Sequence, residues 1–123
     1  PDGALYVGGL RGVPSLPGTA DVYRVVPGHA PTVYATGFSA ITGIAFDRQG
    51  NLLVLEFSTG GLLSPPTTPG ALIKVSRDGA HTRTTIASAG LTQPTGVAVN
   101  SNGTIYVANN GESATNGEIL RIN

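Results

Sequence analysis

The stretch that decides the fold runs from residue 41 to residue 54 and reads Ile-Thr-Gly-Ile-Ala-Phe-Asp-Arg-Gln-Gly-Asn-Leu-Leu-Val. Two short apolar runs, residues 43–46 and 51–55, flank a polar turn that contains Gly50. This pattern predicts two antiparallel strands joined by a tight hairpin turn. The same pattern returns over residues 94–107 as Pro-Thr-Gly-Val-Ala-Val-Asn-Ser-Asn-Gly-Thr-Ile-Tyr-Val, so we expect a repeated unit.

The repeat extends on both sides of these hairpins. Residues 1–7 repeat the turn and the second strand of the hairpin. A further apolar run follows each copy, at residues 21–26, 71–76 and 118–123, and one basic residue interrupts each run at the same place (Arg24, Lys74 and Arg121). A single polar position in an apolar run fits a strand with one wet face. Residues 32–35 and 83–87 supply a last strand.

The unit therefore has four short strands and a period of roughly 50 residues, which is typical of propellers. We label the strands A to D from the inside of a blade outward. Strand A covers residues 43–46 and 96–99, and strand B covers residues 4–7, 51–55 and 104–108. Strand C covers residues 21–26, 71–76 and 118–122, and strand D covers residues 32–35 and 83–87. We predict an all-β fold, about two and a half four-stranded antiparallel blades of a β-propeller. Residues 1–40 would give strands B-C-D of one blade, residues 41–93 a complete blade, and residues 94–123 strands A-B-C of the last.

An open set of blades exposes strand edges and apolar faces. A propeller removes its edges by closing a ring, usually with at least about four blades. We therefore expect the remaining blades to come from a longer chain or from other copies of this one, either as a homo-oligomer or as a larger assembly.

Composition limits the classes of partner. Lys and Arg number seven, as do Asp and Glu, and charged residues make up 11% of the chain. A neutral, weakly charged surface gives no electrostatic basis for binding nucleic acid or an anionic membrane. The absence of cysteine excludes disulfides and thiolate metal sites. No apolar run approaches the roughly 18 residues of a membrane span.

The candidate site lies on the face that carries the long connections. The B–C connections (residues 8–20, 58–70 and 110–117) and the D–A loops (residues 36–40 and 88–93) share one face, and long loops on a rigid scaffold are where binding is usually found. Our candidate ligand-binding residues at the mouth of the central channel are Thr42, Glu56, Thr95, Asn109 and Asn110.

Each candidate also has a structural interpretation. Glu56 could bind a cation or a polar ligand, or could be a strand-end carboxylate that is solvated or paired with a neighbouring blade. Thr42 and Thr95 could line the channel, or could make turn hydrogen bonds before a glycine. Asn109 and Asn110 could offer amide ligands, although Asn-Gly is first a turn former.

Catalytic motifs are not evident in the sequence. His29 and His81 fall in or beside C–D turns, on the face opposite the long loops, so we expect both to be solvated. There is no nucleophile elbow, no phosphate-binding glycine loop and no histidine pair at metal-ligand spacing. Asn102-Gly103-Thr104 matches the glycosylation sequon within a hairpin turn.

Four stretches carry a family resemblance: residues 1–7 (PDGALYV), 41–58 (ITGIAFDRQGNLLVLEFS), 83–111 (RTTIASAGLTQPTGVAVNSNGTIYVANNG) and 117–123 (GEILRIN). They resemble the C-terminal part of the ScyD/ScyE family of bacterial β-propellers, within the wider NHL and gluconolactonase-like (SMP-30) propellers. The resemblance implies a six-bladed disc in an exported protein, extracellular or periplasmic, with no established catalytic set. Gluconolactonase-like relatives bind a divalent cation, such as calcium, around the central channel, and Glu56 and Asn109 are the counterparts here by location.

Three functions remain open on these grounds. The first is a non-enzymatic binding or scaffold propeller that uses the long-loop face. The second is a metal-dependent hydrolase of the lactonase type, with Glu56 as a metal ligand. The third is a self-assembling extracellular structural protein, in which open blades pack into a fibre or sheath.

Overall fold

The computed structural model describes residues 3–9, 17–61, 68–111 and 117–122. Within these ranges the chain forms ten strands and no helix. The strands are β1 (Leu5–Gly8), β2 (Ala20–Val25), β3 (Thr32–Phe38), β4 (Ile41–Phe46), β5 (Leu52–Glu56), β6 (Ala71–Val75), β7 (Arg83–Ala87), β8 (Gly96–Val99), β9 (Ile105–Asn109) and β10 (Glu118–Ile122). The described residues include no helix that is long and apolar enough to cross a membrane.

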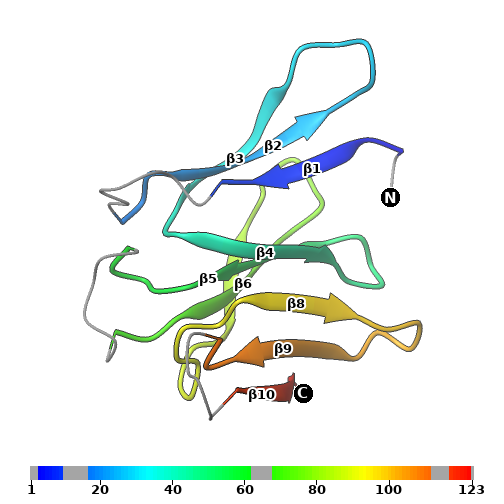
Figure 1. Cartoon of the computed structure of the whole chain (residues 1–123). Helices are drawn as coiled ribbons and strands as arrows, with labels where there is room; N and C mark the ends of the chain where they lie inside the picture. The colour runs from blue at the N-terminus through cyan, green and yellow to red at the C-terminus, as the bar shows by residue number, and fades with distance from the viewer. Residues whose placement is uncertain (1–2, 10–16, 62–67, 112–116, 123) are drawn as a thin grey trace.

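The ten strands form three antiparallel sheets that lie in successive layers (Figure 1). The first sheet has the order β1-β2-β3, the second β4-β5-β6-β7 and the third β8-β9-β10. Each sheet follows the chain order, as a blade of a propeller does. The predicted fold class, a partial β-propeller with one four-stranded blade between two shorter sheets, is confirmed.

The two A–B hairpins use the same turn chemistry. The Asp47 carboxylate accepts hydrogen bonds from the backbone N–H groups of Gln49 at 3.0 Å and Asn51 at 2.8 Å. The amide oxygen of Asn100 accepts equivalent bonds from Asn102 at 3.0 Å and Thr104 at 2.9 Å. A short polar side chain thus closes each turn on its own backbone and sets the register of the hairpin.

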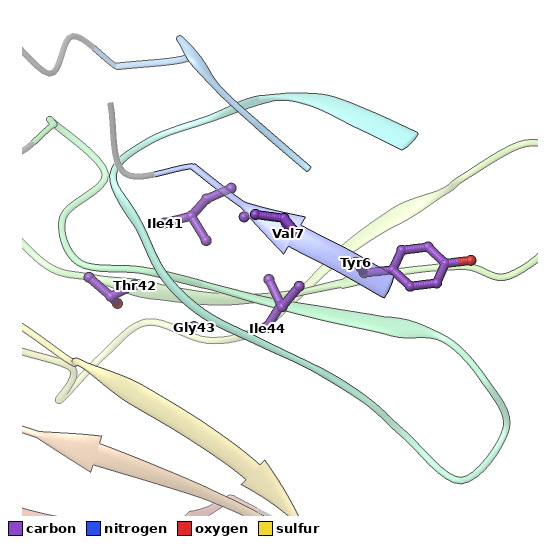
Figure 2. Close-up of a pocket in the computed structure, with 7 residues that line it drawn as sticks. Tyr6, Val7, Ile41, Thr42, Gly43 and Ile44 are labelled. Atoms are coloured by element: carbon purple, nitrogen blue, oxygen red, sulfur yellow. The ribbon is translucent and has the colours of Figure 1, made fainter. Parts of the chain in front are cut away.

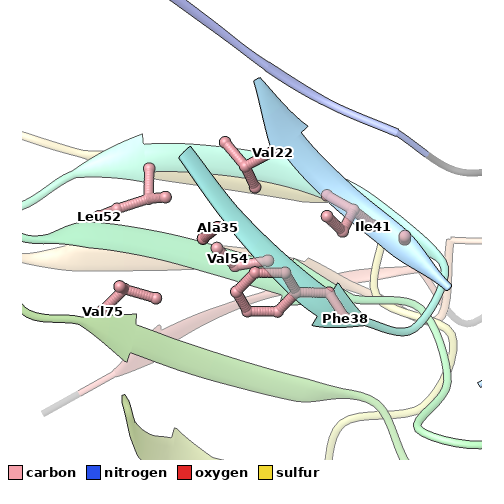
Figure 3. Close-up of a cluster of buried hydrophobic side chains, with 8 residues drawn as sticks. Val22, Ala35, Phe38, Ile41, Leu52, Val54 and Val75 are labelled. Atoms are coloured by element: carbon pink, nitrogen blue, oxygen red, sulfur yellow. The ribbon is translucent and has the colours of Figure 1, made fainter. Parts of the chain in front are cut away.

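Two apolar cores separate the three layers. The first lies between the first and second sheets and contains the buried residues Ala20, Val22, Ala35, Phe38, Ile41, Leu52, Val54 and Val75 (Figure 3). The second lies between the second and third sheets and contains Leu53, Leu55, Leu72, Leu91 and Val107. Strand β5 is buried along its whole length and contributes alternate side chains to both cores. Burial on both faces explains why strand β5 is the most continuously apolar strand of the chain.

The outer strand of the first sheet is longer than the sequence predicts. Strand β3 continues through residues 36–38, which were expected to belong to the D–A loop. The register with strand β2 shifts twice, once within this extension, between Ala35 and Phe38, and once before it, between Val33 and Ala35. The guanidinium of Arg83, on the neighbouring sheet, donates to the carbonyls of Thr36 and Gly37 and lies 4.1 Å above the ring of Phe38. A cation on an aromatic face and two carbonyl contacts stabilise the extended backbone.

Only one of the two histidines is solvated as expected. His29 is exposed in the turn between β2 and β3. His81 is half-buried, and its ring centre lies 4.5 Å from that of Tyr34 on the first sheet. The expectation for His81 is wrong because the turn between β6 and β7 folds against the neighbouring blade.

Candidate functional site

The candidate site lies at the end of the molecule where one blade passes into the next. Figure 1 shows the connection between β3 and β4 at this end, and the β4–β5 and β8–β9 turns at the other. Glu56 is the last residue of β5 and Asn109 the last residue of β9. The two side chains therefore occupy equivalent places beside successive D–A loops.

Glu56 is buried and holds the first of these loops. Its side chain is 5% exposed, and its Oε2 accepts a hydrogen bond from the backbone N–H of Ser39 at 2.6 Å. Burial raises the pKa of the Glu56 carboxyl above 4.5, and the hydrogen bond from Ser39 and the charge of Arg83 partly oppose that rise. The carboxylate thus faces a backbone donor inside the protein.

Asn109 holds the second loop in the same way. Its side chain is 2% exposed, and its Oδ1 accepts the backbone N–H of Thr92 at 2.8 Å. Its Nδ2 donates to the carbonyl of Gly90 at 2.8 Å and to Oε1 of Glu118 at 3.0 Å. Thr92 in the second loop corresponds to Ser39 in the first by the repeat. Both blades therefore use a side-chain oxygen at the end of strand B to bind one backbone donor of the adjacent D–A loop.

The loop conformation that these bonds fix is unusual. Ala40 and Gln93 follow the two bonded N–H groups, and both have a left-handed backbone, with φ of 43° and 47°. Non-glycine residues pay a conformational cost there, so surrounding contacts must hold them. Phe57 N–H donates to the carbonyl of Ala40 at 2.9 Å, and Gly111 N–H donates to that of Gln93 at 3.0 Å.

The two threonines lie beside the D–A loops, and Thr42 directly follows Ile41, which pairs with Glu56. Thr42 Oγ1 donates to the carbonyl of Pro94 at 2.9 Å, which joins the second blade to the loop that enters the third. Thr95 is exposed, and its side chain packs against Gly111, where a Cβ would lie 2.4 Å from Thr95 Oγ1. Thr42 therefore makes a link between blades, whereas Thr95 packs on the chain that leaves β9.

Asn110 shares a partner with Asn109. Its Nδ2 lies 3.4 Å from Oε1 of Glu118, and its backbone N–H donates to the carbonyl of Thr92 at 2.9 Å. Its φ is 55°, again in the left-handed region that asparagine tolerates better than most residues. Of the five candidates, Asn109 and Asn110 are thus brought together, on one carboxylate oxygen.

Sequence reasoning missed the partners that define this site, which are Ser39, Thr92 and Glu118. The repeat contains a signal that could have identified Glu118, which is an acidic residue at the same rim of each blade. The register places one carboxylate in each pair at the B–C rim: Glu56 opposite Ala71, and Asn109 opposite Glu118. In the first sheet, Gly9 N–H donates to the carbonyl of Asp21, so Asp21 takes the same place there. Each blade thus has one acidic residue at this rim, on strand C in the first and third sheets and on strand B in the second.

The site shows no cluster of the residues that most often hold metals. Among the residues that the structure describes, no group of three or more His, Cys, Asp or Glu side chains lies together. The oxygens of Glu56 and Asn109 instead point to backbone donors of separate loops. What this arrangement does directly is to fix loop backbone.

Comparison with known proteins identifies one part of the chain. The NHL repeat model matches residues 91–114, which include the end of the second D–A loop, β8, the hairpin turn and β9. No curated protein and no solved structure matches the chain. The repeat, the sheet order and the strand register together identify the fold as part of a β-propeller, and residues 91–114 of it match an NHL repeat.

Proposed function

We propose that this chain is part of a non-enzymatic binding or scaffold propeller, and that its contact surface is the face formed by the D–A and B–C loops. One observation carries the proposal: Glu56 and Asn109, both buried, fix the backbone of two successive D–A loops through the same bond. Loops that are held before a partner arrives lose little conformational entropy on binding. ScyD/ScyE-like propellers, to which the sequence is similar, are exported, and we propose the same location here.

The chemistry of the exposed loop residues indicates the kind of partner. Thr36, Thr92 and Thr95 are exposed on or beside the two loops, and Thr92 is flanked by no charged residue. The chain has no net charge, so such hydroxyl groups donate and accept hydrogen bonds with little long-range electrostatic steering. We therefore propose an uncharged polar partner and no role for nucleic acid.

The lactonase alternative requires Glu56 to serve as a metal ligand. A metal bound by Glu56 would have to share the carboxylate with the hydrogen bond that Oε2 accepts from Ser39. The burial that raises the pKa of Glu56 also disfavours the ionised form that a metal needs. The loop-holding role uses these groups as they stand, which supports a scaffold over a calcium-dependent hydrolase.

The test places a photo-crosslinking amino acid on either face of one blade. Thr92 lies on the loop face and Ser101 lies in the β8–β9 turn on the opposite face, and both are exposed. In the cells that produce the protein, we expect crosslinked adducts from position 92 and none above background from position 101. Equal crosslinking from both positions, or crosslinking from position 101 alone, would overturn the proposal.

A further inference from the structure

A cavity lies between the inner edges of the first two sheets. Its volume is about 270 Å³, and it is lined by residues 6–8 of β1 and residues 41–44 of β4 (Figure 2). Strand β1 is an edge strand of its sheet, and among the described strands it pairs with β2 alone. The cavity therefore follows one edge of β1 on the side nearest to β4.

The backbone N–H of Gly8 points toward this edge of β1. Gly9 N–H donates to the carbonyl of Asp21 on β2 at 3.0 Å. Since donors alternate between the two edges of an antiparallel strand, the N–H of Gly8 is directed to the other side, away from β2. A Cβ at Gly8 would lie 2.7 Å from Cγ2 of Ile41, so the two strands approach closely here.

The other two sheets show what occupies the equivalent place. In the second sheet β4 pairs with β5, with Gly43 opposite Leu55 and Ile44 opposite Val54. In the third sheet β8 pairs with β9, with Gly96 opposite Ala108 and Val97 opposite Val107. By the repeat, Leu55 and Ala108 correspond to Gly8, and Val54 and Val107 correspond to Val7.

We propose that this edge binds an extended segment of sequence pattern Thr-Gly-aliphatic-Ala-aliphatic, which pairs antiparallel with β1 and fills the cavity. Its glycine lies opposite Gly8, its first aliphatic residue opposite Val7, its alanine opposite Tyr6 and its last residue opposite Leu5. Strand addition of this kind takes affinity from the backbone and specificity from alternate side chains. The inference concerns a different surface from the loop face and does not rest on the proposed function.

The contact between β4 and β8 explains why the pattern needs its glycine. A Cβ at Gly43 would lie 3.3 Å from both the N and the Cγ1 of Val97, so innermost strands of successive blades approach almost to backbone contact. A segment on β1 would meet β4 in the same way, and its glycine would face Gly43. A larger residue there would clash with backbone, which cannot move aside.

A folded second copy does not offer such a segment from its described strands. Its two innermost strands, β4 and β8, are already paired with β5 and β9 along the edge that would have to face β1. The occupant is therefore a strand of this pattern that is not yet part of a sheet. The cavity lining contains no charged side chain, which matches the uncharged pattern.

The experiment titrates a fluorescent peptide with the sequence of residues 92–100 (Thr-Gln-Pro-Thr-Gly-Val-Ala-Val-Asn) into the chain and follows anisotropy. We expect saturable binding, slower hydrogen exchange at the Gly8 amide, and at least about tenfold weaker binding of the peptide with Val in place of its Gly. Val7→Asp in the chain should weaken binding at least about tenfold, whereas Val33→Asp, at 55% exposure against 51% for Val7, should not.

Three outcomes would overturn the inference. One is equal binding of the wild-type, glycine-substituted and scrambled peptides. Another is binding that leaves the exchange of the Gly8 amide unchanged. The third is protection of Gly8 that increases with the concentration of the chain alone, which would assign the edge to a second copy.

Discussion

Glu56 is the residue whose expected role differs most from the role that the structure shows. Its sequence position, at the end of an apolar strand on the loop face, favours a metal ligand as readily as a structural carboxylate. In the fold its Oε2 accepts the N–H of Ser39 from within the protein, at 5% exposure. A buried backbone donor without an acceptor is costly, so this bond alone gives the residue a structural role.

Two substitutions of Glu56 distinguish the role of its oxygen as a hydrogen-bond acceptor from the role of its charge. Glu56→Gln keeps an acceptor for Ser39 N–H, so we expect a change of less than about 1 kcal/mol in the free energy of unfolding. Glu56→Ala removes the acceptor and leaves a cavity, and should cost about 1–3 kcal/mol. Urea denaturation of the two variants measures the difference. Equal losses in both would show that the charge, and not the acceptor, matters.

The raised pKa of Glu56 gives a pH dependence of defined sign. Between its ordinary value of 4.5 and its raised folded-state value, the folded chain holds a proton that the unfolded chain has released. The contribution of Glu56 to the free energy of unfolding is therefore fully present below pH 4.5 and falls as the pH rises through the folded-state pKa.

The comparison with Glu56→Gln isolates this contribution from other titrating groups. The free energy of unfolding of the wild type minus that of the variant should be largest below pH 4.5 and should decrease toward neutral pH. A difference that grows with pH would mean that the folded protein prefers the ionised carboxylate.

Each strand pair at the B–C rim carries one acidic residue. Asn109 donates to Glu118, and the corresponding pair in the second blade is Glu56 with Ala71. A carboxylate at both members of one pair would place like charges opposite each other, which destabilises a sheet. This repulsion fits the single acidic residue in each pair.

Exchanging the acid and the amide between positions 109 and 118 tests this pairing. Asn109→Asp removes the donor to Gly90 and Glu118 and buries a second carboxylate, so we expect a loss of more than about 2 kcal/mol. Adding Glu118→Gln restores a donor on the facing strand and should recover more than half of that loss. Thermal or urea denaturation of the three variants measures the coupling. Additive losses would show that the residues act independently.

The strand order was predictable because each strand of the repeat has its own sequence pattern. The hairpin glycines, Gly50 and Gly103, mark strand boundaries, and the basic residue of strand C keeps the copies in register. The D–A loops were not predictable in this way. Their left-handed residues, Ala40 and Gln93, are not glycine, and the bonds that hold them join residues 17 positions apart, as Ser39 and Glu56 do. Only the folded backbone brings such groups together.

The whole molecule has apolar side chains exposed at both outer faces. Leu5 is 63% exposed on the first sheet and Ile119 is 69% exposed on the third. By the repeat, Leu5 corresponds to Leu52, which is buried between blades. Patches of this kind favour association.

Charged substitutions at these positions test whether the outer faces associate. We expect Leu5→Lys with Ile119→Lys to change the free energy of unfolding by less than about 0.5 kcal/mol each, because both side chains are already exposed. Sedimentation velocity should show less self-association than in the wild type. Val107→Lys, at a fully buried position, should unfold the chain and serves as the contrast. Unchanged self-association would place the contact elsewhere.

Glu56 and Asn109 hold the two D–A loops of the proposed binding face. The most direct measurement is the melting temperature of the chain and of Glu56→Gln, with and without calcium. If the carboxylate serves the loop, calcium leaves both melting temperatures unchanged. A calcium-dependent rise in the wild type that Glu56→Gln abolishes would contradict the account and would make Glu56 a metal ligand.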